Sequence, residues 1–196
     1  MVILWDQKED KPNSDRHITS LISAGTVFLN ETQELSNNIA CIWIHRYKDY
    51  ATKKRLVTIG ISNIDNHTGR SNVLEITNEF YHNPTTYDEI EHFISIYKPS
   101  ETIVVYNIET ETVDDFIQYT NINSPLIRKI NLGDTDSQLS NDAKNCENQI
   151  YQDEILRQFY EGFDRSIHQE YHFNPIGCQS FCYLLNYIYI HNQSLV

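Results

Sequence analysis

The sequence is poor in glycine, and its glycines do not form a phosphate-binding loop. Its 196 residues include six glycines, which stand singly along the chain. The Walker A pattern Gly-x-x-x-x-Gly-Lys-Ser/Thr does not occur, so no run of backbone N–H groups is available to cradle a nucleotide phosphate. The sequence therefore predicts no nucleotide cofactor and no ATP hydrolysis.

Basic residues are also few. Fifteen Lys and Arg stand against 27 Asp and Glu, which gives a formal net charge of −12. Such a surface repels the phosphates of nucleic acids unless its basic residues are clustered. We therefore expect any contact with DNA to be weak or indirect.

The four cysteines lack the spacing of zinc ligands or of a redox motif. None forms a Cys-x-x-Cys pair, and no histidine lies at zinc-ligand spacing from them. Free thiols of this kind are typical of a reducing intracellular compartment. No apolar stretch is long enough to span a membrane, and Asp6 follows the first apolar residues too closely for a signal peptide. We therefore predict a soluble, intracellular protein without a bound metal.

The apolar pattern predicts a sheet that begins with a meander. The run 39–45, IACIWIH, and the alternating stretch 56–64, LVTIGISNI, indicate two strands joined by a polar loop. A turn at 65–69, DNHTG, leads to a third strand at 73–76. These three strands are expected to pair antiparallel.

Helices and strands alternate after the meander. Apolar residues recur at helical spacing over 87–97, with Thr86 and Glu89 as a capping box at the start of that helix. A buried strand at 102–106, a second helix near 113–117 and a weaker strand at 127–132 follow. The order indicates an α/β domain with a mixed sheet, of which the RNase H-like fold is the best-known representative.

Changes in composition divide the chain. The charged segment 6–16 is expected to be a mobile lead-in, and residues 133–148 hold no apolar period and indicate a domain boundary. Beyond the boundary, apolar stripes predict a helix at 151–159 and another after Pro175. We therefore predict a polar lead-in within residues 1–38, an α/β domain at 39–135 and the start of a helical domain at 145–196.

Asp65 is a candidate metal ligand, because an RNase H-like nuclease carries its first metal-binding carboxylate at the end of a central strand. Two-metal hydrolysis requires further carboxylates from other strands. The nearby acids fall on apparent solvent faces: Glu75, Glu79, Asp88, Glu89 and Glu91. We therefore interpret Asp65 as a turn-initiating residue and predict no catalytic or metal-binding residue.

The loop RYKDYATKKR is the one concentration of positive charge. It holds five of the 15 basic residues, namely Arg46, Lys48, Lys53, Lys54 and Arg55. Tyr47 and Tyr50 stand between them, so the loop has the groups for phosphate pairing and base stacking. A solvated hairpin loop is the favoured interpretation, because no second basic patch extends the footprint.

Two pairs of residues stand four apart, as on one face of a helix. His168 and His172 lie in a polar stretch without the Glu of a metalloprotease motif, which indicates a surface face. Cys178 and Cys182 lie in an apolar stripe, which indicates small core residues rather than a redox pair.

Short motifs stand in a fixed order along the chain. They are RHITSLISAGT at 16–26, NETQELSNNIA at 30–40, IGISNIDNHTGR at 59–70 and PSETI at 99–103. In this order they resemble the MutS family of DNA mismatch-repair proteins: the exit from its mismatch-binding domain, then the start, the Asp-x-x-Thr-Gly hairpin and a strand start of its connector domain. Ser23 and Ala24 replace the Thr and Pro that the family has in the first motif.

The resemblance continues into the C-terminal part of the chain. Gln152, Leu156 and Phe159, and then residues 180–187, are similar to the opening of the family's lever domain. A composition rich in Asn, Tyr and Ile is closer to the branch found in large DNA viruses and octocoral mitochondria. Phe159-Tyr160-Glu161 has the Phe-x-Glu form with which the family reads mismatches, but that signature belongs near the start of the first domain. We interpret it here as core packing.

The resemblance implies a non-catalytic connector fragment, from a truncated or split protein, that couples mismatch recognition to ATPase activity and partner binding. Its partners would be other MutS segments or subunits and a MutL-like protein. Two alternatives remain: a metal-dependent RNase H-like nuclease or resolvase that uses Asp65, and a freestanding scaffold or inhibitor that binds repair proteins.

Overall fold

The structure, a computed structural model, describes residues 2–7, 16–22, 37–166 and 169–191, and the chain divides into the compact units Met1–Asn37 and Asn38–Val196. In the first unit, β1 (Val2–Gln7) and β2 (Arg16–Ile22) pair antiparallel. The two strands therefore include Asp6, Gln7 and Arg16 of the segment that the sequence predicted to be a mobile lead-in. The missed signal was the apolar, β-prone run at the start of β1. The rest of the predicted lead-in, at 8–15, and the motif segment at 23–36 lie outside the described residues.

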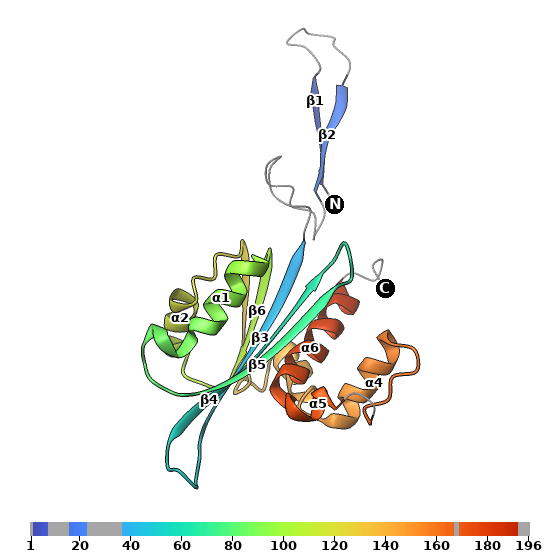
Figure 1. Ribbon diagram of the computed structural model, residues 1–196. Helices are drawn as coiled ribbons and strands as arrows, with labels where there is room; N and C mark the ends of the chain where they lie inside the picture. The colour runs from blue at the N-terminus through green and yellow to red at the C-terminus, as the bar shows by residue number, and fades with distance from the viewer. Residues whose placement is uncertain (1, 8–15, 23–36, 167–168, 192–196) are drawn as a thin grey trace. The chain divides into compact units, whose positions relative to one another are not determined.

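The second unit is built on a five-stranded mixed sheet with the order β5-β4-β3-β6-β7 (Figure 1). Its strands are β3 (Asn38–Lys48), β4 (Arg55–Asp65), β5 (Ser71–Glu79), β6 (Glu101–Tyr106) and β7 (Leu126–Asn131). The first three form the predicted antiparallel meander, and β6 and β7 run parallel to β3. This confirms the predicted α/β class and is consistent with an RNase H-like arrangement.

One face of the sheet is covered by the helices of the two crossover connections. The short 3-10 helix η1 (Pro84–Tyr87) and α1 (Asp88–Tyr97) join β5 to β6, and α2 (Thr110–Tyr119) joins β6 to β7. Parallel strands need such crossovers. The hydrophobic core on this face has Tyr87, Phe116, Ile42, Ile44 and Ile90 among its largest buried members.

The predicted capping box at the start of α1 was wrong. Thr86 lies inside η1, where its buried hydroxyl donates to the Tyr81 carbonyl at 2.6 Å. The N-cap of α1 is Tyr87, which makes no side-chain capping bond. The 3-10 turn moves the helix start by one residue, from 87 to Asp88, so Thr86 serves the preceding loop instead.

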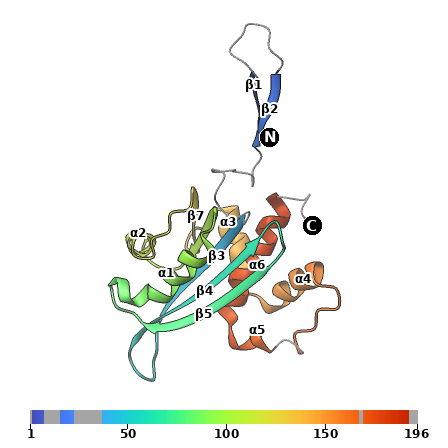
Figure 2. The same cartoon turned by 45° about the horizontal axis from the view of Figure 1, so that its top comes forward.

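The opposite face is covered by the chain that follows the last strand. It forms α3 (Gln138–Asn145), α4 (Gln149–Phe159), α5 (Glu170–Phe173) and α6 (Pro175–His191). Figure 2 shows α4 and α6 on the side of the sheet away from α1 and α2. Because successive strand residues point to opposite faces, Cys41 and Trp43 of β3 belong to this core while Ile42 and Ile44 belong to the other. Burial on both faces explains the unbroken apolar run that predicted β3.

α3 was not predicted, because it lies in the segment 133–148 that the sequence analysis took for a boundary. Its N-cap is Ser137, whose hydroxyl accepts from the Ser140 backbone N–H at 3.5 Å. Only a few of its residues are buried, among them Ser140 and Ala143, and Cys146 follows them. Ser140 and Ala143 are small and the helix is short, so its sequence shows no apolar residues at helical spacing.

The start of α6 touches the backbone of β4 directly. A Cβ atom on Gly60 would lie 2.3 Å from the carbonyl oxygen of Ile176, so only glycine permits this approach. From β5, a carboxylate oxygen of Glu75 accepts a hydrogen bond from the Gly177 backbone N–H at 2.8 Å, although partial burial raises the pKa of that carboxyl. α6 thus packs on the sheet, and the assignment of residues 145–196 to the start of a separate helical domain stays a prediction. None of the described helices has the length and apolar character needed to cross a membrane.

Candidate functional site

The five basic residues predicted as possible nucleic-acid contacts lie on one hairpin. β3 and β4 pair as far as Lys48 and Arg55, and residues 49–54 form the turn between them. β6 pairs with β3 only as far as Ile44, so residues 45–48 extend beyond that neighbouring strand. The hairpin end therefore protrudes from the sheet (Figure 1).

Carboxylates neutralise two of these five positive charges. The Arg46 guanidinium lies 2.5 Å from a carboxylate oxygen of Glu109, and the Lys54 ammonium lies 2.7 Å from one of Glu79. Such solvent-exposed pairs contribute little to stability. Each nevertheless offsets a charge that would otherwise be available to a phosphate.

The other three cations remain exposed at the hairpin end. Lys48, Lys53 and Arg55 are solvent-exposed and make no ion pair with any residue that the structure describes. Between them, the Tyr50 side chain is 90% exposed. Three exposed positive charges and an accessible aromatic ring therefore lie on the same hairpin end.

The turn that carries these groups is held by Asp49. Its carboxylate accepts from the Ala51 and Thr52 backbone N–H groups at 3.1 and 3.2 Å and from the Thr52 hydroxyl at 2.5 Å. These bonds, the one from the Thr52 hydroxyl first, lower the pKa of the Asp49 carboxyl. The Asp49 backbone N–H donates to the Lys54 carbonyl at 2.9 Å, and Lys53 has a left-handed φ of 60°. The negative charge of Asp49 is thus directed into the turn.

Asp65 does the same work in the next turn of the meander. Its carboxylate accepts from the His67 backbone N–H at 3.0 Å and from the Thr68 hydroxyl at 2.7 Å. The Asp65 backbone N–H donates to the Arg70 carbonyl at 3.0 Å, and Gly69 has a φ of 69°. Asp65 is therefore a turn residue, as interpreted from the sequence. Within the described ranges, no three His, Cys, Asp or Glu side chains are placed to hold a metal ion.

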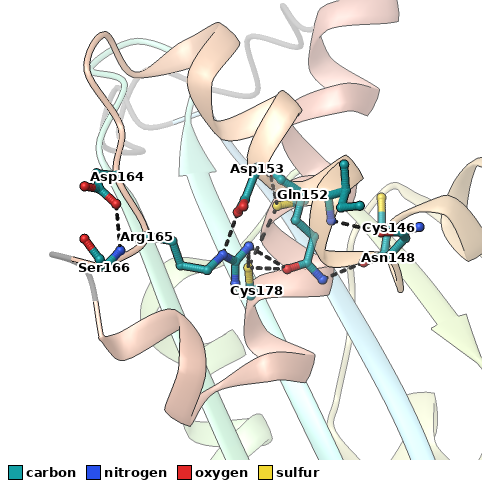
Figure 3. A network of polar contacts seen from close by, with 10 residues as sticks. Cys146, Asn148, Gln152, Asp153, Asp164, Arg165, Ser166 and Cys178 are labelled. Carbon is teal, nitrogen blue, oxygen red and sulfur yellow. Dashed lines mark hydrogen bonds and ion pairs between the residues drawn. The ribbon is translucent and has the colours of Figure 1, made fainter.

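A buried polar network lies between α4, α6 and the loop that joins α4 to α5 (Figure 3). Arg165, which is 9% exposed, donates from Nε to Asp153 at 2.5 Å and from Nη2 to the Gln152 side-chain oxygen at 2.9 Å. Gln152 in turn donates to the Cys146 carbonyl at 2.7 Å. A charged side chain thus ties the loop to α4 and to the end of α3.

The network includes a thiol pair on α6. Cys178 donates to the Gln152 side-chain oxygen at 3.2 Å, and its sulfur lies 4.0 Å from that of Cys182. The hydrogen bond from Cys182 and the positive charge of Arg165 lower the pKa of the Cys178 thiol. The same hydrogen bond and burial raise the pKa of the Cys182 thiol. Both side chains are at most 1% exposed, which confirms the prediction of core cysteines.

A depression of about 520 Å³ lies between β5 and α1. Apolar side chains of Leu74, Phe93 and Ile96 line it together with Asp88, Glu89 and His92. Ile96 is 58% exposed there. It is the kind of apolar surface with an acidic border on which a partner can pack.

The remaining sequence candidates occupy separate places. Phe159 ends α4 with its ring 6.1 Å from that of Tyr189, while Tyr160 is 41% exposed and Glu161 is exposed. Core packing therefore describes the Phe159 ring and in part the Tyr160 ring, which lies 6.4 Å from that of the buried Phe181, but not Glu161. His172 is exposed, and His168 lies outside the described residues.

Sequence reasoning missed the network residues and the repeated turn. Gln152 and Arg165 carry no local signal, because their partners lie on other elements. The turn had a signal: Asp-x-x-Thr occurs at 49–52 and again at 65–68, each time between two strands.

Comparison with known proteins indicates a relation to one family. No family model matches the chain. The sequence is 28% identical over 110 residues to a DNA mismatch repair protein MutS homologue of Acanthamoeba polyphaga mimivirus. The similarity indicates a distant, partial relation to MutS. The matched segment makes up 54% of this chain but 9% of the viral protein, so the chain corresponds to a small part of its MutS-like relative.

Proposed function

We propose that this chain is a non-catalytic connector segment of a MutS-type DNA mismatch-repair protein, which couples mismatch recognition to ATPase activity and partner binding. The observation that carries the proposal is the similarity to the mimivirus MutS homologue. Residues 1–38 would be the exit from a mismatch-binding domain, 39–135 the connector and 145–196 the start of a lever domain.

The connector-like motifs support this proposal through the fold. Gly60 allows α6 to reach β4, and the turn of Asp65 to Arg70 fixes the hairpin of β4 and β5. At the strand start PSE, Ser100 donates its backbone N–H and its hydroxyl to the Asn38 carbonyl at 2.8 and 3.0 Å. Glu101 accepts from Arg128 of β7 at 2.9 Å and from the Tyr187 hydroxyl of α6 at 2.6 Å. These motif residues hold the sheet and its helices together, as residues shared through a common fold would.

The non-catalytic part of the proposal is supported by the position of Asp65. Its carboxylate accepts hydrogen bonds from within the turn, as the Asp49 carboxylate does in the β3–β4 turn. Asp49 does not lie at a position typical of a nuclease ligand, so this geometry is explained by turn formation alone. Replacing Asp65 by Asn and assaying Mg²⁺- or Mn²⁺-dependent cleavage tests this. If the native chain cleaves nucleic acid and the substitution abolishes this activity, the chain is a nuclease and the proposal of a non-catalytic connector is wrong.

The depression beside α1 is the surface on which we place the partner contact. The full chain, used as bait, should retain a MutL-like protein or the remaining segments of a MutS-like protein from a mixture of purified candidates. Ile96→Asp puts a charge at the apolar part of this surface and should reduce retention at least tenfold. Ile150→Asp changes an equally apolar residue that is 70% exposed on α4 and is the matched control.

The two variants make the outcome specific. Retention lost in Ile96→Asp and kept in Ile150→Asp supports partner binding at α1 and β5. Retention that neither change affects moves the contact elsewhere on the chain. A native chain that retains none of these proteins contradicts the coupling role.

A further inference from the structure

We propose that the end of the β3–β4 hairpin binds single-stranded nucleic acid, with Tyr50 stacking on a base while Lys48, Lys53 and Arg55 contact the flanking phosphates. The proposal rests on the geometry of the hairpin and does not depend on the relation to MutS. Single strands are favoured over a duplex because their unpaired bases can reach an exposed ring.

The charge distribution is the first argument. The chain as a whole is strongly acidic, with a net charge of −12, yet three exposed cations without ion pairs gather within eight residues of each other, at 48, 53 and 55. The single acid of the turn, Asp49, accepts three hydrogen bonds from inside the turn. Glu109 and Glu79 are each paired with a cation of their own. The hairpin end therefore presents a local positive field to an approaching phosphate.

The exposed ring is the second argument. Tyr50 is 90% exposed, so its two ring faces are open to solvent, and Tyr47 nearby on β3 is 39% exposed. An accessible aromatic ring between cations is the combination by which proteins hold single strands without sequence preference. Because residues 45–48 extend past β6, the neighbouring strand does not cover this part of the hairpin.

The backbone of Lys53 is the third argument. The two turns of the meander share four hydrogen bonds and the same left-handed fifth position, which is Gly69 in one turn and Lys53 in the other. A residue with a Cβ atom is strained in this conformation, and glycine is not. The turn of β3 and β4 thus carries a strained lysine where its twin carries an unstrained glycine. The proposed site gives this lysine a use, because its ammonium group would contact a phosphate.

The twin turn also supplies the matched control. His67 and Arg70 occupy in it the positions that Ala51 and Lys54 occupy in the basic turn, and both are exposed. Changes at His67 and Arg70 therefore test an equivalent backbone, on the same protein, that lacks the tyrosine and the lysine cluster.

The experiment is fluorescence anisotropy of a labelled oligo-dT titrated with the full chain at low and at physiological salt. For three phosphate contacts, the slope of log K against log salt should be about −2, at roughly 0.7 per contact. Tyr50→Ala should weaken binding about tenfold, as expected for the loss of one stacked base. Lys53→Asn, which suits the left-handed backbone, should flatten the slope by about 0.7.

The controls decide between this site and general attraction. Lys48→Arg should preserve binding, and His67→Ala with Arg70→Gln should leave both the affinity and the salt slope unchanged. Circular dichroism of each variant checks that the fold is retained. No binding of oligo-dT at low salt, unchanged affinity in Tyr50→Ala, or equal affinity for a duplex would each overturn the proposal.

Discussion

The two faces of the sheet are closed in different ways. The face under α1 and α2 is covered by the crossover connections themselves, and its core is a continuous apolar cluster. The face under α6 is covered by the chain beyond the last strand; it also has an apolar core, to which polar contacts between distant residues are added, such as Glu75 with Gly177, 102 residues apart. The first face is covered by segments that are close in sequence to the strands they cover. The second face depends on contacts between residues far apart in the sequence, which form only when the chain has folded.

The most damaging small change should be Gly60→Ala. The added methyl group meets the Ile176 backbone, which cannot rotate away, so we expect the free energy of unfolding to fall by about 3 kcal/mol. Urea denaturation measures it. On the other face, Ile59→Val removes one buried methyl group and should cost about 1 kcal/mol. Equal costs for the two changes would mean that α6 does not lie against β4 as described.

Arg165→Met should come next. It leaves Asp153 and Gln152 without their main partner, and we expect a loss of about 2 kcal/mol, because Asp153 is partly solvated. Alkylation by iodoacetamide, followed by mass spectrometry, adds a local readout. Release of the loop should expose Cys178, so it should react faster in the variant although the loss of the Arg165 charge raises its pKa, while Cys41, on β3, should stay protected. A uniform increase at both cysteines would indicate general loosening instead.

Sequence patterns predicted the first face better than the second. The alternation in β4 and the helical spacing from Tyr87 to Tyr97 are local signals, and both elements formed as expected. The docking of α6 requires Gly60 to lie opposite Ile176, which no local period encodes. α3 was missed because little of it is apolar.

The candidate site, like the fold, was predictable only where its residues are neighbours in the sequence. The five basic residues stand together in the sequence and stand together on the hairpin. Their partners do not: Glu109 and Glu79 come from other segments, so the sequence alone overstated the available charge.

Lys53→Gly should have a smaller effect, of the opposite sign. Relief of the left-handed strain exceeds the extra backbone entropy of glycine, so we expect the free energy of unfolding to rise by about 0.5 kcal/mol. Gly69→Ala in the twin turn should lower it by about 1 kcal/mol. Thermal denaturation of both variants measures the pair. A destabilised Lys53→Gly would show that the lysine side chain itself supports the turn.

The smallest effect should be the pH dependence that Glu75 confers. Burial raises the pKa of its carboxyl in the folded state, so the fold favours the protonated form relative to the unfolded chain. The stability contributed by protonation is fully present below the ordinary pKa of Glu and is lost as pH rises through the raised value. Urea midpoints measured between about pH 4 and pH 7 should show this decline. Glu75→Gln should flatten it, and an unchanged slope would place its origin in other groups.

The repeated Asp-x-x-Thr turn makes the meander modular. Both turns join consecutive antiparallel strands and share four hydrogen bonds, so the residues at 49–54 and 65–70 can in principle be exchanged without shifting the pairing of any strand. Such a swap would carry Tyr50, Lys53 and Lys54 to the opposite end of β4 while the body of the protein stays the same. The exposed side chains of a turn can therefore be moved to another turn of this sheet as one short sequence, without changes to the core.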